Sequence, residues 1–379
     1  MITDFDIAIC GAGPVGLALA LMLVKRGTPA PRIALIDAKA PEQAARDPRS
    51  IALSYGSRQI LEEVGTWPIA ADAIHQIHVS RRGHFGRTLI DRDDYRLPAL
   101  GYVARYGTLV AALSAAVRQT SVTAIRPAHV TSSAERDECV ELRLADGRIF
   151  TTRIMVQAEG GVFSEQSARA VHRDYDQTAI IAQVSVGAPL MHRAFERFTE
   201  EGPLALLPQE NGYAMVWCVR PPTASRLYAL TDTEFLRELV HAFGSRLGRF
   251  TGITPRATYP LGLNARPAVS ARTVAIGNAA QTLHPVAGQG LNLGLRDAAV
   301  LARLLARSAN PDMLQRFAAA RQSDRSITIT LTDTLARVFA NAPDGAMSQA
   351  ALGFSLALID TIKPAKRLLA EQMMFGRRS

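Results

Sequence analysis

The chain has 379 residues, of which 48% are hydrophobic and 20% charged, a composition typical of a globular protein with a sizeable core and not of a disordered one. Its length allows two domains of ordinary size. The formal net charge is +9, but no basic run interleaved with aromatic residues indicates a nucleic-acid-binding protein. A solvated basic surface is the simpler interpretation of the charge, and attraction to anionic lipid or to an acidic partner is the alternative.

No stretch of the sequence reaches the roughly 18 to 20 consecutive apolar residues of a membrane-spanning helix. The segment from Met1 to Cys10 lacks the basic region and cleavage site of a signal peptide, which predicts a cytoplasmic protein. The three cysteines, Cys10, Cys139 and Cys218, are odd in number and far apart, so we expect reduced thiols and neither a disulfide framework nor a zinc site. No cluster has metal-ligand spacing, and we expect no metal.

The first part of the chain has the pattern of a dinucleotide-binding unit. We expect a short strand at Phe5–Cys10, a glycine turn at Gly11–Gly16, an apolar helix at Leu17–Arg26 and a second strand at Ile33–Ile36. Asp37 follows directly. This order of strand, turn, helix, strand and acidic residue is typical of a βαβ unit that holds a nucleotide cofactor.

Three glycines of the turn, Gly11, Gly13 and Gly16, have G-x-G-x-x-G spacing. The first permits a tight turn, the second lets a pyrophosphate approach the backbone, and the third lets helix and strand pack closely. Asp37 can accept hydrogen bonds from an adenosine ribose, and its charge disfavours the 2′-phosphate of NADP. The segment predicts one bound FAD or NAD, with Pro14 also at the site. A purely structural turn would leave the position of Asp37 to chance.

A second segment, residues 277–297, crowds glycines, a proline and amides between an apolar strand at Arg272–Ile276 and an amphipathic helix at Gly290–Leu304. Such a loop presents backbone N–H groups and a positive helix N-terminus to one place, so we expect an anionic or acceptor-rich ligand there. The candidate cofactor-binding residues of this segment are Gly277, Asn278, Pro285, Gly288, Gly290, Leu291 and Asn292.

These segments resemble the flavin signatures of the aromatic-ring hydroxylases, and above all the ubiquinone-biosynthesis branch of that flavin monooxygenase family. Residues 47–67, 77–86 and 101–109 extend the resemblance. It implies that Arg49 faces the cofactor and that Arg105 is a further cofactor candidate. Taken alone, Arg49 is more typical of a surface residue, and Arg105 could equally be a solvated residue at a helix start.

Residues 175–179 and 195–208 look like strands of that branch's substrate domain, and their alternation independently indicates strands with one buried face. Within them we interpret Glu196 and Arg197 as a surface ion pair worth about 0 to 1 kcal/mol, with no catalytic role.

The chain departs from the family at three positions. After the expected strand Ile154–Ala158, Glu159 and Gly160 replace an Asp-Gly pair that serves flavin and nicotinamide binding in the family. Glutamate keeps the charge but adds one methylene group. Asn278 and Gln281 stand where most relatives have aspartate and many have histidine, and both amides can still hydrogen-bond a sugar hydroxyl. Nearby, His284 is as readily a structural residue as a participant in chemistry, and no catalytic base is assigned.

The resemblance implies a two-domain α/β fold: a discontinuous Rossmann-like FAD-binding domain at residues 1–75, 101–174 and 258–307, and an inserted mixed β-sheet substrate domain at 76–100 and 175–257. Helices at 308–379 complete it. The last segment, 350–378, is amphipathic and basic, with Pro364 interrupting it. It either lies on a membrane surface or packs across the flavin domain or another subunit.

The resemblance further implies that NAD(P)H reduces FAD, that O2 forms a C4a-hydroperoxide, and that a hydroxyl group is delivered to a polyprenylated phenol in ubiquinone biosynthesis. Such a substrate favours peripheral contact with the inner membrane. The alternatives are hydroxylation of a soluble aromatic acid and a flavin-bound assembly subunit of a quinone-biosynthesis protein complex.

Overall fold

The computed structural model describes residues 2–82, 87–160, 171–265, 269–340 and 363–376. The first of its sheets has the strand order β8-β2-β1-β11-β10-β9, with β18 beside β11. Strands β8, β2, β1, β11 and β18 run parallel, and β10 and β9 are antiparallel additions. The strands span Phe5–Cys10 (β1), Ile33–Ile36 (β2), Thr123–Ile125 (β8), Val130–Glu135 (β9), Val140–Leu144 (β10), Ile149–Gln157 (β11) and Thr273–Ala275 (β18).

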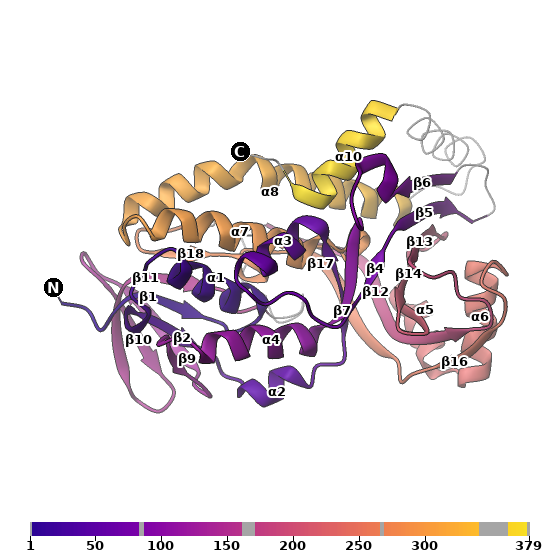
Figure 1. The fold of residues 1–379 in the computed structure, drawn as a ribbon. Coiled ribbons are helices and arrows are strands. Elements are labelled where there is room, and N and C mark those ends of the chain that lie inside the picture. Colours follow the sequence, from indigo (N-terminus) through magenta and orange to yellow (C-terminus); the bar gives the residue numbers. More distant parts are fainter. Residues whose placement is uncertain (1, 83–86, 161–170, 266–268, 341–362, 377–379) are drawn as a thin grey trace.

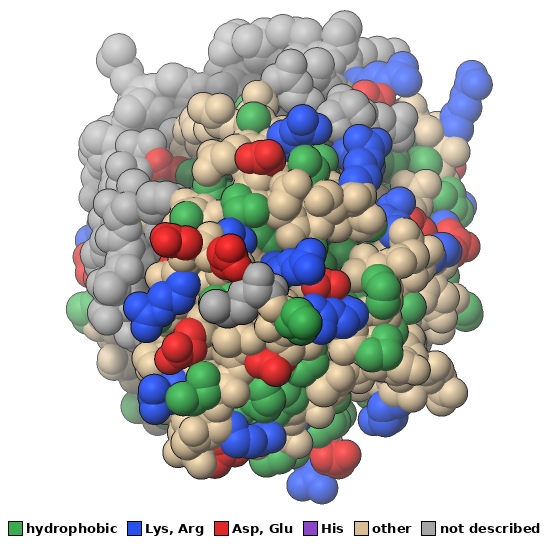
Figure 2. Space-filling model, turned by 90° about the vertical axis from the view of Figure 1, so that its left-hand side faces the viewer, with side chains coloured by type: hydrophobic (Ala, Val, Ile, Leu, Met, Phe, Trp, Pro, Cys, Tyr) green, Lys and Arg blue, Asp and Glu red, His purple; other side chains and the backbone are tan. Residues whose placement is uncertain are grey.

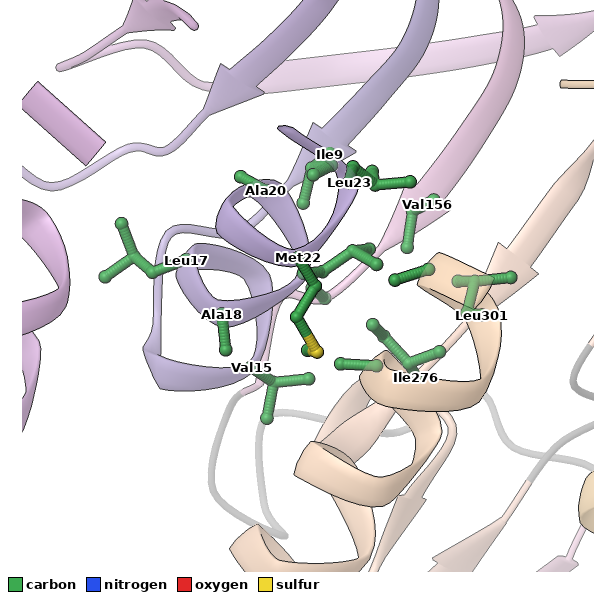
Figure 3. Packing of buried hydrophobic residues seen from close by; sticks show 14 of the residues in the cluster. Ile9, Val15, Leu17, Ala18, Ala20, Met22, Leu23, Val156, Ile276 and Leu301 are labelled. Atoms are coloured by element: carbon green, nitrogen blue, oxygen red, sulfur yellow. The ribbon is translucent and has the colours of Figure 1, made fainter. Parts of the chain in front are cut away.

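Helices α1 (Pro14–Lys25), α4 (Tyr106–Arg118) and α7 (Gln289–Leu305) pack on this sheet, and α8 (Pro311–Ala340) packs on α7. Figure 3 shows Met22 of α1 pointing toward Ile276 and Leu301, so the helix of the first glycine motif and the helix of the second share one core. Fully burying one such side chain contributes about 1.5–3 kcal/mol. This core fixes the two motifs relative to each other.

The larger sheet has the order β19-β17-β12-β15-β14-β13-β5-β6, with β16 beside β12. It is mixed, because β13 pairs with β5 in parallel and the other pairs are antiparallel. Its strands are Gln76–Arg81 (β5), Arg87–Asp91 (β6), Val171–Val186 (β12), Arg193–Phe198 (β13), Pro203–Gln209 (β14), Gly212–Val219 (β15), Phe250–Ile253 (β16), Ala257–Ala265 (β17) and Gln281–Thr282 (β19).

Helices α5 (Pro221–Ala229) and α6 (Asp232–Phe243) cover the outer face of the larger sheet. A capping box starts α6, since Thr231 accepts from the Glu234 backbone and Glu234 accepts from the Thr231 backbone. Phe195, Trp217 and Phe235 belong to the core between helices and sheet. The opposite, inner face is turned toward the first sheet and its helices (Figure 1).

A small sheet, β3-β7-β4, lies between the two larger ones. Its strands are Ser50–Ser54 (β3), Ala71–Ile74 (β4) and Gly101–Arg105 (β7), and the remaining helices are α2 (Pro41–Ala45), α3 (Tyr55–Glu63) and α10 (Lys363–Phe375), with short 3-10 turns at Ala30–Arg32 (η1), Arg92–Tyr95 (η2), Gly277–Ala279 (η4) and Val286–Gly288 (η5).

The predicted α/β fold with a mixed second sheet is confirmed. The first helix begins at Pro14 and not at Leu17, because proline fits the first helical turn, where its missing N–H costs no hydrogen bond. The domain boundaries stay predictions: β17 and β19, from the segment predicted for the FAD domain, pair within the larger sheet.

Helix α10 packs onto protein. Ala370 and Met374 are buried against Leu100, and Phe375 meets Tyr55 edge-on at 6.0 Å between ring centroids. Of the two arrangements predicted for this segment, on a membrane surface or packed on protein, residues 363–376 adopt the packed one. Arg377 and Arg378 of the predicted basic terminus, like residues 83–86 of the segment 77–86, lie outside the described residues.

Charged side chains of both signs intermingle on the face shown in Figure 2, as in a solvated surface. Among the helices of the described ranges, none is long and apolar enough to cross a membrane. Nor do the described residues include a cluster of His, Cys, Asp and Glu that could hold a metal ion.

Candidate cofactor and substrate site

The first glycine turn is packed so tightly that side chains are excluded. A Cβ on Gly16 would overlap the carbonyl oxygen of Gly11. Gly11 itself has φ +111°, and a Cβ there would lie 2.5 Å from the carbonyl carbon of Ala158 and the nitrogen of Glu159. The turn therefore contacts the backbone that directly follows β11. It leads into the N-terminus of α1, whose backbone N–H groups can bind an anionic ligand.

Asp37 closes the turn from the end of β2. Its carboxylate accepts the Ala12 N–H at 2.6 Å and the Lys39 N–H at 2.7 Å. Each oxygen still has a lone pair for a ribose hydroxyl, as predicted for this residue. The aspartate is thus held in place by backbone donors before any nucleotide binds.

Arg126 is a residue of this region that sequence reasoning missed. Its side chain is 4% exposed, and one guanidinium nitrogen lies 4.0 Å from Asp37, while Nε donates to the Lys39 carbonyl at 3.0 Å. Burial lowers the pKa of this guanidinium, with Asp37 opposing that shift. The available signal was its place directly after β8, since the carboxyl ends of neighbouring parallel strands meet at the ligand-binding edge of a sheet.

Arg49 lies beside the same glycine turn. Its guanidinium stacks on Tyr106 at 4.9 Å from the ring centroid and pairs with Asp47 at 2.7 Å. The Tyr106 hydroxyl is 3.3 Å from where a Cβ on Gly13 would stand. The structure therefore brings Arg49, Tyr106 and Gly13 together where a pyrophosphate is predicted.

Arg105 makes a different set of contacts. It donates to Gln183 on β12 at 2.7 Å and forms an ion pair with Glu210 at 2.8 Å. Gln183 is in the larger sheet and Glu210 is in the turn between its strands β14 and β15, so this side chain joins β7 to that sheet. Its predicted cofactor contact stays a prediction.

Glu159, Gly160, Asn278 and Gly290 converge although they come from distant parts of the chain. A Cβ on Gly160 would lie 2.8 Å from the Asn278 Cβ, and one on Gly290 would lie 3.8 Å from Asn278 Oδ1. Partial burial, followed by the charge of Asp37, raises the pKa of Glu159. The pair Glu159–Gly160 and the second segment, residues 277–297, thus meet near the N-terminus of α7.

The second segment begins with a compact loop, residues 277–290, around that N-terminus. It is called here the flavin loop. Gly277 and Gly288 have φ of +58° and +60°, and Gly288 directly precedes α7. Pro285 begins the short turn Val286–Gly288, and Leu291 packs against the flavin-side core. The loop leads into the α7 N-terminus, whose backbone N–H groups can stabilise negative charge on a ligand.

The side chain of Asn292 is used inside the protein. Its Oδ1 accepts from the Ser54 N–H at 2.8 Å and from the Ser57 hydroxyl at 2.7 Å. Its Nδ2 donates to the Ala52 carbonyl at 3.1 Å and the Gly288 carbonyl at 2.7 Å. Asn292 therefore fixes the loop to β3, and a cofactor contact by this side chain stays a prediction.

His284 is structural in this arrangement. Nδ1 accepts the Val286 N–H at 3.1 Å, so Nε2 carries the proton and donates to Gln177 Oε1 at 2.9 Å. The ring is buried and edge-on to Tyr175 at 5.2 Å. Burial lowers the pKa of His284 to about 3, which keeps the imidazole neutral. Of the two roles left open, the structure supports the positioning one.

The inner face of the larger sheet lies on the far side of this loop. Its strand pairing aligns one row of side chains across β12, β15, β14, β13 and β5: Ile181, Val216, Ala205, Glu196 and Val79. All five are partly exposed, whereas their outer-face neighbours form a buried core. This row, called here the inner row, is apolar except for one carboxylate.

Glu196 and Arg197 do not form the expected surface pair. Successive side chains of a strand point to opposite faces, so Arg197 is on the face of Phe195 and Glu196 is on the inner face. Glu196 Oε1 is buried and has no hydrogen-bond partner within the described parts of the chain. The dipeptide sequence alone could not predict this burial, because adjacent opposite charges fit a solvent-exposed strand equally well.

The residues at this site fit a dinucleotide cofactor such as FAD. The glycine turn leaves no space for side chains but leaves backbone N–H groups available, Asp37 is positioned for a ribose, and Arg49 lies beside the expected pyrophosphate. When bound, FAD would supply the redox chemistry. The chain would supply position, donors and a shielded cleft.

The chain is similar to known proteins over most of its length. A model described as "FAD binding domain" matches residues 4–325. The chain is 31% identical to the ubiquinone hydroxylase UbiL of Rhodospirillum rubrum, covering 97% of this chain and 89% of the relative. It is 34% identical to an uncharacterised Synechocystis protein, with 100% and 95% covered.

Among solved structures, p-nitrophenol 4-monooxygenase PnpA of Pseudomonas putida superposes with a TM-score of 0.79 at 15% identity, covering all of both chains. HpxO of Klebsiella pneumoniae, solved with FAD and uric acid, gives 0.74 at 15% identity, covering 98% of this chain and 97% of that one. At such identities the likeness is one of fold. The match over residues 4–325 and the 31% identity to a ubiquinone hydroxylase over nearly the whole chain identify the chain as a member of the family of FAD-dependent aromatic-ring monooxygenases.

Proposed function

We propose that the chain hydroxylates a polyprenylated phenol in ubiquinone biosynthesis, with NAD(P)H as electron donor and O2 as the oxygen source. The observation that carries this proposal is the inner row, an apolar surface with one carboxylate on the side of the sheet turned toward the flavin loop. Such a surface suits a phenol with a hydrocarbon tail better than an aromatic acid. The carboxylate of the acid would add a second negative charge beside Glu196 and would need a cation. Named ubiquinone hydroxylases among the relatives support the same substrate class.

We infer further that Gly11, Gly13, Pro14, Gly16, Asp37 and Arg49 hold the adenosine and pyrophosphate part of FAD. Glu159, Gly160, Asn278 and the loop Pro285–Gly290 lie on the flavin side. Donors at the α7 N-terminus would stabilise negative charge on the reduced ring, and the covering sheet would keep water out.

The proposal includes work at a membrane surface, because a polyprenyl tail partitions into bilayers. Since Ala370 and Met374 of α10 face protein, α10 would take part through exposed basic side chains such as Arg367, which would exchange its ion pair with Glu371 for lipid phosphate. Each such charge near an anionic leaflet is worth about 1 kcal/mol.

The test is anaerobic reduction of the flavin by NADPH and by NADH, with and without a short-chain prenylated methoxyphenol, followed by product analysis after oxygen is admitted. We expect flavin reduction that the phenol accelerates, and a product heavier by one oxygen atom. The matched control is 4-hydroxybenzoate, a soluble aromatic acid, which we expect to give less than a tenth of the rate.

Two results would replace the proposal. Faster turnover of the aromatic acid would assign the enzyme to soluble substrates. FAD binding without reduction by either nicotinamide under any substrate would favour an assembly subunit of a quinone-biosynthesis complex, the alternative that Glu159 and Asn278 motivate.

A further inference from the structure

We propose that Glu196 is a catalytic residue that binds the phenol hydroxyl of the substrate and takes up its proton. This inference rests on the proposed function, which places a phenol against the inner face of the larger sheet. The residue comes from β13, in the middle of the inner row.

The position of Glu196 follows from its neighbours on the same face. Ala194, two residues earlier, packs with Ile74 of β4 and Val103 of β7. On the same face of β15, which β14 separates from β13, Cys218 packs with Leu283 of the flavin loop and Leu293 of α7. Glu196 therefore lies between the small sheet and the flavin loop, on the face that both of them approach.

One oxygen of the carboxylate is left without a protein partner. Within the described residues Glu196 Oε1 is buried without a hydrogen-bond partner, an arrangement that costs about 1–3 kcal/mol and is rarely retained without a use. Other polar side chains of this face are engaged. Gln183 bonds Arg105 and Gln209, at 2.7 Å each, and Gln177 bonds His284 at 2.9 Å.

Charged groups on the adjoining strands do not neutralise it. Arg81 on β5 stands opposite Phe198, two residues further along the same face. Arg197 is on the opposite face, where Arg246 and Arg82 contribute to its electrostatic surroundings. Burial raises the pKa of Glu196 to about 7, closer to the value of a phenol, about 10, than a solvated carboxylate would be.

The chemistry is a proton transfer. The phenol O–H bond breaks, the proton goes to the Glu196 carboxylate, and the electron pair stays on oxygen as a phenolate. A phenolate directs electron density to its ortho and para ring carbons, which is where an electrophilic oxygen adds. Val79, Ala205 and Val216 beside the carboxylate offer apolar contact for the ring.

The kinetic test compares Glu196→Gln with wild type on the prenylated methoxyphenol. The amide can still accept a hydrogen bond but cannot take up a proton. We expect the phenol Kd to stay within about threefold and kcat to fall by about 10²-fold or more, the usual contribution of a general base. Glu200→Gln, exposed on the following turn, is the control and should change neither quantity. Equal kcat in Glu196→Gln and wild type would overturn the proposal.

A binding test needs no turnover. A nitrophenol, which ionises near neutral pH, is titrated into the FAD-loaded protein while its phenolate absorbance is followed. In wild type, affinity should fall steeply as pH rises, because the phenolate meets an ionised carboxylate. In Glu196→Gln the fall should be at least threefold smaller, and coincident pH curves would overturn the proposal. Flavin content and thermal unfolding establish that the isosteric variant is folded.

The two tests separate this inference from the proposed function. If the wild type hydroxylates no phenol but the nitrophenol curves differ, the proposed function fails and the phenol-binding role of Glu196 stands. If the wild type hydroxylates the prenylated phenol and Glu196→Gln does so equally fast, only the assignment of Glu196 fails.

Discussion

At the scale of single residues, the lack of space for a side chain determines which positions of the glycine turn must be glycine. Gly16 cannot carry a side chain, because its Cβ would overlap the Gly11 carbonyl oxygen, which is backbone and cannot rotate away. The same close approach that lets α1 pack on β1 brings the N–H groups of the turn to the ligand.

We therefore expect Gly16→Ala to lose most bound FAD and to be destabilised by several kcal/mol, within the upper range for single substitutions, about 4–5 kcal/mol. The measurement is flavin content after reconstitution together with denaturant unfolding. Gly27→Asn is the control, since nothing lies within 4 Å of its Cβ position and its φ of +91° is a left-handed one that asparagine tolerates better than most residues. Retention of FAD by Gly16→Ala would contradict this account.

A second residue-scale prediction concerns stability and pH. Burial raises the pKa of Glu196 to about 7 from 4.5, so the folded state prefers the protonated form. The stability this confers is present below about pH 4.5 and is lost as pH rises to about 7. Above that, the wild type should be about 3 kcal/mol less stable relative to Glu196→Gln than it is in acid, at about 1.4 kcal/mol per pKa unit.

Denaturant unfolding of wild type and Glu196→Gln between pH 5 and 8.5 measures this difference. It should widen in favour of the variant as pH increases. A difference that stays constant across that range would mean that the carboxylate has a partner or is solvated.

These two residues show what sequence can reveal. The glycine spacing and Asp37 could be predicted because their requirements are local, being set by a turn and a strand end. The proposed role of Glu196 could not, because its surroundings come from β5, β14 and the flavin loop. Arg105 was likewise indeterminate, since its partners Gln183 and Glu210 lie about 80 and 100 residues away in the chain.

At the scale of elements, one amide couples α7 to β3. Asn292 uses both its acceptor and its donor sites, so its replacement by aspartate turns two donations into two acceptor–acceptor contacts in a buried place. We expect Asn292→Asp to cost about 2–4 kcal/mol, from two lost bonds and the unsatisfied carbonyls they leave. The flavin loop should loosen with it.

Unfolding free energy and FAD affinity, measured on the same preparation, test this coupling. Asn310→Asp is the matched control, because the Asn310 side chain accepts from the Met313 N–H near the start of α8, and aspartate retains that acceptor. If Asn292→Asp lowered neither quantity, Asn292 would not be what holds the loop.

Elements themselves were largely predictable. The strand after the first helix was placed at its observed bounds, and the helix of the second signature within one residue at each end, since periodicity and flanking glycines are local signals. Pairing partners were not. That the two-residue strand β19 pairs with β17 depends on a contact that no periodicity encodes.

At the scale of the whole molecule, a buried network connects the second signature to the C-terminal helices. Asp324 of α8 accepts from Arg296 of α7 at 2.9 Å and from Gln372 of α10 at 2.9 Å, and it lies 2.6 Å from Arg321. Arg321 also bonds Asp297 at 2.7 Å. The flavin loop helix, the long helix and the last helix thus share charges that are removed from water.

Asp324→Asn should cost about 3–5 kcal/mol, because it leaves the buried Arg296 without its carboxylate partner and Arg321 with Asp297 alone. Denaturant unfolding gives the value. Asp312→Asn, at an exposed position in the first turn of the same helix, removes an equal charge and should cost no more than about 1 kcal/mol. Similar losses in both variants would mean that the network adds nothing specific.

The two faces of the larger sheet have different roles. Aromatic and aliphatic residues under α5 and α6 form the outer core, while the inner row contributes little to that core. Substitutions along the inner row can therefore accumulate without unfolding the domain. Because the outer face holds the fold, the ligand that the inner row faces can be changed through a few side chains at little cost in stability.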